Sequence, residues 1–172
     1  MKVKILKTVN LKKSLISEIC KLKNTEWQYG ISSNLKWFKE NISNSDNHFL
    51  LFKSKILIGY VVLRERNFFI RKVKKNYFFF DTLIIKKKFR NRNYSSLILD
   101  LCNRFIKKKK KPALLFCFKK MEKFYSKFNW EKINKKNYKI LDYKTSKTGM
   151  IFNLKTHNKF KFYFLTKKYF KI

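Results

Sequence analysis

Apolar residues follow two different periods along the chain. Alternating or continuous apolar runs, which are typical of β-strands, occupy residues 2–8, 48–52, 56–64, 78–85, 113–118, 150–154 and 160–165. Apolar residues spaced three or four positions apart, which predict amphipathic helices, occupy residues 11–22, 35–42, 97–105 and 119–128. Residues 66–76 are basic and follow neither period, so we expect a long connection there.

The order of these elements predicts the class of fold. Residues 53–55 join two apolar runs as a hairpin, whereas predicted helices separate other strands. Residues 113–118 (ALLFCF) are continuously apolar, as expected of a strand that is buried on both faces. We therefore predict an α/β fold with a mixed, mostly antiparallel central sheet and helices on both faces, in three α/β/α layers. No repeat or linker interrupts the pattern, so we expect a single domain over residues 1–172, with a core of about 1–155 and a further C-terminal strand.

A basic turn separates the strand at 78–85 from the helix at 97–105. The turn spans residues 86–93 and leads directly into the N-terminus of that helix. Exposed backbone N–H groups and the helix dipole make such a junction attractive to anions. The pattern therefore predicts a phosphate-binding turn.

The chain is strongly basic, with a formal net charge of +34. Only six of its 44 basic residues are Arg, although Arg is the residue suited to bidentate phosphate recognition. Lys, Asn, Ile, Phe and Tyr are abundant, and all five have A/T-rich codons, whereas Ala, Pro and Gly are scarce. We therefore favour an AT-rich genome as the source of the charge, and a nucleic-acid partner is the less favoured interpretation.

Several classes of protein are disfavoured by the composition. No apolar run is long enough to insert into a membrane, and the N-terminus lacks the apolar segment of a signal peptide. Three scattered cysteines are expected to be free thiols in the cytoplasm. Two histidines and those cysteines lack metal-ligand spacing, so we expect no metal. A nucleotide P-loop and a GxSxG elbow are also missing.

Two stretches of the sequence carry a family resemblance. Residues 90–95 (RNRNYS) occupy the place of a motif that runs Arg or Gln, two variable residues, Gly, one variable residue, and Gly or Ala. Residues 125–130 (YSKFNW) match a second signature, Tyr-x-Lys-x-Gly-Phe, at the expected distance. Together with the order of elements, these stretches resemble the GNAT superfamily of acyl-CoA-dependent N-acyltransferases over residues 1–155.

Four positions depart from the family pattern. Asn93, Ser95 and Asn129 replace glycines, and Phe118 replaces a frequent Asn. Asn tolerates a positive φ better than other residues that carry a side chain, so two of the glycine replacements are conformationally mild.

The resemblance implies that acetyl-CoA is the acyl donor. Backbone N–H groups of residues 91–95 would hold its pyrophosphate, and the edge of the preceding strand would pair with its pantetheine arm. The implied cofactor positions are Leu83, Ile84, Ile85, Arg90, Asn91, Arg92, Asn93, Tyr94 and Ser95.

The resemblance also suggests catalytic residues. Tyr125 is the candidate general acid that protonates the departing CoA thiolate, and the alternative for it is a core aromatic on an amphipathic helix. Asp81 is the candidate general base, because a carboxylate inside the apolar stretch FFFDTLII is unusual. The alternative for Asp81 is a structural carboxylate. Glu65 and His48 are weaker candidates for the base.

The acceptor is expected to be a small primary amine, such as an amino sugar or sugar nucleotide. Trp27, Tyr29, Trp37 and His48 are the candidate acceptor residues, and core packing is an equal alternative for Trp37. The predicted function is a cytoplasmic N-acetyltransferase, monomeric or homodimeric, that transfers acetyl directly within a ternary complex. The alternatives are a basic RNA- or ribosome-binding module and a non-catalytic member that uses the same fold.

Overall fold

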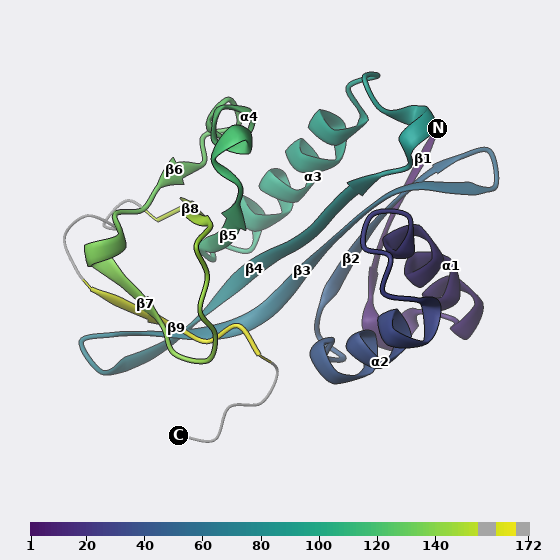
Figure 1. Cartoon of the computed structure of the whole chain (residues 1–172). Coiled ribbons are helices and arrows are strands. Elements are labelled where there is room, and N and C mark those ends of the chain that lie inside the picture. The colour runs from purple at the N-terminus through teal and green to yellow at the C-terminus, as the bar shows by residue number, and fades with distance from the viewer. Residues whose placement is uncertain (155–160, 168–172) are drawn as a thin grey trace. The chain divides into compact units, whose positions relative to one another are not determined.

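The computed structural model describes residues 1–154 and 161–167 (Figure 1). In this part of the chain the strands are β1 (Lys2–Lys7), β2 (Asn47–Lys53), β3 (Ile56–Ile70), β4 (Val73–Ile85), β5 (Ala113–Cys117), β6 (Glu131–Lys132), β7 (Tyr138–Ile140), β8 (Thr148–Phe152) and β9 (Phe162–Phe164). The α-helices are α1 (Lys13–Asn24), α2 (Ile31–Asn41), α3 (Tyr94–Lys108) and α4 (Glu122–Ser126).

The strands form a mixed sheet in the order β1-β2-β3-β4-β5-β8-β6, and β9 pairs with both β3 and β7. Antiparallel pairs join β1 to β2, β2 to β3, β3 to β9, β5 to β8 and β6 to β8. Parallel pairs join β4 to β5 and β7 to β9. The predicted α/β fold with a mixed, mostly antiparallel sheet is therefore confirmed.

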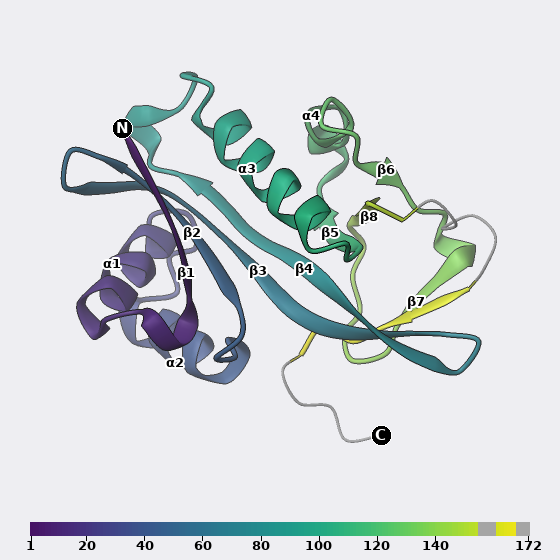
Figure 2. The same cartoon turned by 180° about the vertical axis from the view of Figure 1, so that it is seen from behind.

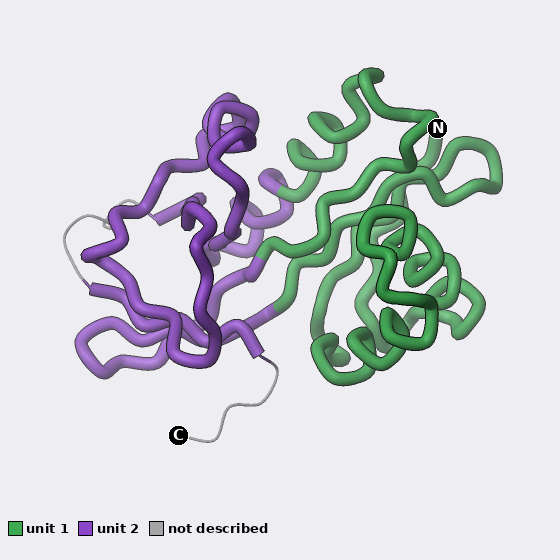
Figure 3. Tube along the Cα trace, in the orientation of Figure 1, with its two compact units in different colours: residues 1–64, 80–102 green, residues 65–79, 103–172 purple. Residues whose placement is uncertain are grey.

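The chain divides into two compact units that share β3, β4 and α3 (Figure 3). Unit 1 contains residues 1–64 and 80–102, and unit 2 contains residues 65–79 and 103–172. The single domain expected from the sequence stays a prediction, and we describe each unit by itself.

The core of unit 1 lies between the sheet and the two N-terminal helices. α1 and α2 lie on one side of the strands, and the first part of α3 lies on the other (Figures 1 and 2). The apolar stripe of α1 contributes Ile19, Cys20 and Leu22 to this core, and the alternating positions Tyr60 and Val62 of β3 face them.

The buried face of α3 differs in part from the one predicted. The spacing predicts apolar positions at Leu97, Ile98, Leu101, Cys102 and Phe105. Ile98 and Cys102 are fully buried, as is Leu99, which the spacing did not include, whereas Leu97 is 36% exposed. Successive residues on an α-helix point about 100° apart, so a stripe inferred from apolar spacing alone can be rotated by one residue from the face that is buried.

Unit 2 has its own aromatic core. Phe68, Tyr77, Phe162 and Phe164 pack there with ring centroids 5.0–6.1 Å apart. The expected long connection at residues 66–76 is wrong, because β3 continues to Ile70 and β4 begins at Val73. Arg71 and Lys72 both adopt a positive φ (48° and 65°), as the central residues of a two-residue type I′ hairpin do. The alternation was hidden because Arg66 is buried on the same face as Phe68, and because residues 71–76 at the hairpin are exposed and mostly basic.

Shorter elements in unit 2 also differ from expectation. The predicted helix at 119–128 is a 3₁₀ turn (Lys119–Met121) followed by the single turn α4. β6 and β7 were not predicted, since strands of two and three residues are too short to show a period. β9 confirms residues 162–164 of the predicted strand at 160–165, and residue 160 lies outside the described residues.

Candidate functional site

A break in β4 marks the candidate site in unit 1. Thr82 lies inside the strand but adopts φ 62°, a conformation that β-branched residues rarely take. Holding a residue in such a region costs about 1–3 kcal/mol, and these residues gather at functional sites. The break changes the alternation of side chains, so that Ile84 packs in the core beneath α1 and α2.

The break follows the end of the β4–β5 ladder by three residues. These two strands pair only at Phe78–Ala113 and Phe79–Leu114. Residues 81–85 of β4 therefore continue in unit 1 beyond the residues that pair with β5. Ile84 and Ile85 bury their side chains, so a ligand that meets this strand would meet its backbone edge.

The turn after β4 presents backbone N–H groups. It contains a 3₁₀ turn (Lys87–Phe89), and both Asn91 (φ 60°) and Asn93 (φ 58°) then adopt left-handed conformations. The carbonyl of Asn93 accepts the N–H of Leu97 at 3.0 Å, so the N–H groups of residues 94–96 precede the first hydrogen bond of α3. Successive residues of right- and left-handed conformation point their backbone N–H groups to one side, and at the start of a helix this arrangement forms an anion-binding nest. Asn93 thus takes a left-handed conformation at the position where the resembled motif has Gly.

Arg90 connects this turn to two other parts of unit 1. Its Nε donates to the carbonyl of Ile85 at 3.0 Å, and its Nη2 pairs with the carboxylate of Glu26 in the segment between α1 and α2. Arg92 is exposed and extends from the turn. Of the two arginines expected to contact pyrophosphate, Arg90 already binds protein groups, whereas Arg92 is exposed to solvent.

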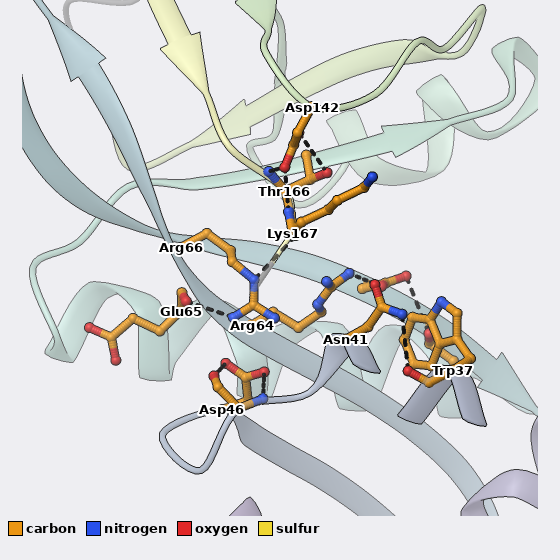
Figure 4. A network of polar contacts seen from close by, with 12 residues as sticks. Trp37, Asn41, Asp46, Arg64, Glu65, Arg66, Asp142, Thr166 and Lys167 are labelled. Carbon is orange, nitrogen blue, oxygen red and sulfur yellow. Dashed lines mark hydrogen bonds and ion pairs between the residues drawn. The ribbon is translucent and has the colours of Figure 1, made fainter. Parts of the chain in front are cut away.

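Asp81 lies just before the break, in a group of charged residues. Its Oδ2 accepts from Nη1 of Arg64 at 2.9 Å, and its Oδ1 accepts from the hydroxyl of Thr82 at 3.2 Å. Its side chain keeps 26% of its surface exposed. Arg64 is buried and extends toward Trp37 of α2, with its Cζ 5.5 Å from the ring centroid (Figure 4).

Lys23 completes this group. It is 5% exposed, and its Nζ lies 3.2 Å from the centroid of the Trp37 ring. Burial lowers the pKa of Lys23 to about 8, although Asp81 acts in the opposite direction. Neither Lys23 nor Arg64 was predicted as a site residue. A signal existed, because Lys23 continues the apolar stripe of α1 (Ile16, Ile19, Cys20) and Arg64 continues the inward alternation of β3.

The four predicted acceptor residues do not gather at one surface. Trp27 and Tyr29 are 38% and 74% exposed in the segment between α1 and α2, whereas Trp37 is half-buried beside Arg64 and Lys23. His48 lies in the core of unit 1 with no exposed surface.

Protein groups engage both ring nitrogens of His48. Nδ1 lies 2.8 Å from the hydroxyl of Tyr60, and Nε2 lies 2.8 Å from that of Thr8. The ring also stacks on Phe38 at 5.7 Å. Burial lowers the pKa of His48 to about 4, so it is neutral at pH 7. These contacts describe a core histidine.

The predicted general acid lies in unit 2. Tyr125 is 7% exposed on α4 and meets Trp130 edge-on at 6.3 Å. Asn129 ends this segment at φ 62°, in the conformation expected of the residue that replaces Gly. Glu65, a weaker candidate for the base, forms an ion pair with Lys111 in the same unit. The catalytic role of Tyr125 stays a prediction.

Comparisons with known proteins identify the fold. No protein-family profile and no curated protein sequence matches the chain. Escherichia coli YhbS, a GNAT family N-acetyltransferase solved with CoA, superposes with a TM-score of 0.71 at 10% identity, covering 97% of this chain and 89% of YhbS. Escherichia coli ElaA gives 0.65 at 13% identity, covering 87% and 97%. Bacillus subtilis YlbP, an N-acetyltransferase solved with coenzyme A, gives 0.55 at 16% identity, covering 88% and 96%.

This chain therefore has the GNAT fold. No helix among the described residues is long and apolar enough to cross a membrane. The same residues contain no group of three His, Cys, Asp or Glu side chains that could hold a metal ion.

Proposed function

We propose that the protein is an N-acetyltransferase that moves an acetyl group from acetyl-CoA to the primary amine of a small molecule. One observation carries the proposal: the strained residue Thr82 interrupts β4. The residues that follow it in β4 form a strand edge that does not pair with β5, and they lead into a turn that is suited to an anion. The edge suits an extended arm with amide groups, and the turn suits a pyrophosphate. YhbS and YlbP, which share the fold, were solved with CoA.

The donor would be held mainly by backbone groups. N–H groups of residues 91–96 would bind the pyrophosphate, with Arg92 adding charge and Arg90 holding the turn in shape through Ile85 and Glu26. The backbone of residues 83–85 would pair with the pantetheine arm. Because these contacts use the main chain, Asn93 and Ser95 can stand where the family has Gly.

The transfer would proceed within a ternary complex. Asp81 would accept a proton from the acceptor ammonium, directly or through water, so that the neutral amine attacks the thioester carbonyl. As the C–N bond forms and the C–S bond breaks, Tyr125 would donate a proton to the departing thiolate, and the second proton lost by the nitrogen would return to the tyrosinate, directly or through water. Arg64 would keep the Asp81 carboxylate in place through the 2.9 Å ion pair. The role of Tyr125 rests on its match to the family signature.

Thermal stabilisation by acetyl-CoA tests the proposal. At 100 times its dissociation constant, a bound ligand stabilises the folded protein by about 2.7 kcal/mol. RNA at about 150 mM salt is the comparison, because binding of a polyanion to lysines is strongly salt-dependent. Stabilisation by RNA alone would contradict the proposal and favour a nucleic-acid-binding module, and no response to either ligand would favour a non-catalytic member.

Two variants test the chemistry separately from binding. Asp81→Asn and Tyr125→Phe should each lower the release of CoA thiol at least tenfold, since general acids and bases contribute roughly 10²–10⁴ in rate. Both should retain the stabilisation by acetyl-CoA. Asp100→Asn and Tyr143→Phe are matched controls at exposed positions and should leave turnover unchanged. Normal turnover in Tyr125→Phe would remove this residue from the mechanism.

A further inference from the structure

A buried lysine lies where an amphipathic helix normally carries an apolar residue. Lys23 is 5% exposed and occupies the core-facing stripe of α1, one turn after Ile19 and Cys20. Its ammonium rests against the Trp37 ring, 3.2 Å from the centroid. Among the described residues its Nζ makes no ion pair and no hydrogen bond. The proposed mechanism makes no use of this group.

The charges around Lys23 do not balance. The ionisable groups that act on its ammonium are Cys20 on the same helix, Arg64 on β3 and Asp81 on β4. Burial raises the pKa of Cys20, so this thiol is neutral at pH 7. The group therefore holds two cations and one carboxylate, and Arg64 already pairs with that carboxylate at 2.9 Å.

An uncompensated cation that is removed from water is costly unless an anion joins it. The cation–π contact with Trp37 offsets only part of this cost. Two neighbours of Lys23 border solvent, because Trp37 is half-buried and the Asp81 side chain is 26% exposed. A small anion could therefore enter and provide the missing negative charge.

We propose that Lys23, with Arg64 beside it, forms an anion subsite that binds a carboxylate or phosphate carried by the acceptor amine. This inference rests on the proposed function, in which the amine meets Asp81. Binding through Lys23 would place the anionic group near Trp37 and leave the amine toward the carboxylate. Two buried cations would also repel polyamines, so the acceptor class is amino acids or amino-sugar phosphates rather than polycations.

Direct titration of Lys23 by NMR tests the subsite. Lysine labelled with ¹³C at the ε carbon gives one resonance per residue, and Lys23→Met assigns the Lys23 resonance by its disappearance. An anion bound beside the ammonium favours the charged form and raises its pKa. Inorganic phosphate and acetate should each raise this pKa by one pH unit or more relative to chloride at equal ionic strength, corresponding to tenfold tighter binding to the charged form.

Matched variants keep the test specific. Lys21→Met removes an exposed lysine from the same helix and should leave the response of Lys23 unchanged. Phosphate alone shifting the pKa would select a phosphorylated acceptor, and acetate alone would select a carboxylate. A Lys23 pKa that is the same in all three salts would overturn the inference, and a lower melting temperature of Lys23→Met would then assign the residue a purely structural role.

Acetyl transfer provides a second, independent measurement. In pairs of acceptors that differ only by a carboxylate, such as an amino acid and its decarboxylated amine, Lys23→Met should raise KM at least tenfold for the acid and little for the amine. Acetyl-CoA should stabilise this variant as it does the wild type. If the wild type did not bind acetyl-CoA, the proposed function would be contradicted. The NMR titration tests the anion subsite independently of that result.

Discussion

The buried histidine of unit 1 predicts a specific loss of stability in mild acid. His48 has a pKa of about 4 in the folded protein and about 6.5 when unfolded. Below pH 6.5 the His48 side chain binds a proton in the unfolded chain but not in the folded protein. The free energy of unfolding therefore decreases as the pH falls from 6.5 toward 4. At pH 5 these two pKa values correspond to a loss of roughly 2 kcal/mol relative to pH 7.5.

The physical cause of this shift lies in the contacts of the imidazole ring. The ring is enclosed by Phe38 and Tyr60, and hydroxyl groups of Tyr60 and Thr8 lie 2.8 Å from its nitrogens. Asp46 is the carboxylate that acts on it, and this charge offsets only part of the effect of burial. Protonation would therefore place a poorly compensated cation in the core of unit 1.

Urea denaturation at a series of pH values measures the effect. The free energy of unfolding of the wild type should decrease by roughly 2 kcal/mol more than that of His48→Gln between pH 7.5 and pH 5. Glutamine does not titrate, and His157 is present in both proteins, so its contribution cancels. Parallel curves for the two proteins would refute the assignment of His48 as a neutral core residue.

Three further predictions concern the turn, a close contact and the C-terminal strand. Asn93→Gly should keep the affinity for acetyl-CoA, whereas Asn93→Val should weaken it by roughly tenfold in calorimetry, because a β-branched residue resists φ 58°; equal affinities would contradict the role of the turn. Gly149→Ala should lower the free energy of unfolding by about 1–3 kcal/mol in urea, because its Cβ would lie 2.9 Å from the hydroxyl of Tyr138 and 3.0 Å from Ile133, and an unchanged midpoint would mean that these neighbours move aside. Asp142→Asn should speed amide exchange in β9, because the carboxylate accepts N–H groups of Thr166 at 2.7 Å and of Lys167 at 2.6 Å (Figure 4); exchange in β1 and β2 should stay at the wild-type rate, and an equal increase there would indicate global destabilisation instead.

Local patterns in the sequence were sufficient for most of the elements. Alternation, continuous apolar runs and helical spacing predicted β1, β2, β5 and the helices α1–α3. The helices each place one face against a core, and β2 and β5 are buried along both faces, so their apolar residues follow these simple patterns. The same reasoning failed at residues 66–76, because Arg66 is buried on the same face as Phe68 and the exposed residues 71–76 around the hairpin turn are mostly basic. The family resemblance, rather than these patterns, led us to expect Asn93 and Asn129 where the motifs have Gly, and both residues adopt a positive φ, which Asn tolerates.

The sequence by itself determined the fold class and the junction after β4, since strand, turn and helix follow one another within a few residues. Only the tertiary structure decided which polar side chains are buried. Lys23, His48 and Arg64 each lie in an amphipathic pattern that is equally compatible with a side chain reaching solvent. Burial depends on partners far along the chain, such as Asp81 for Arg64 and Thr8 for His48, and no local period records those contacts.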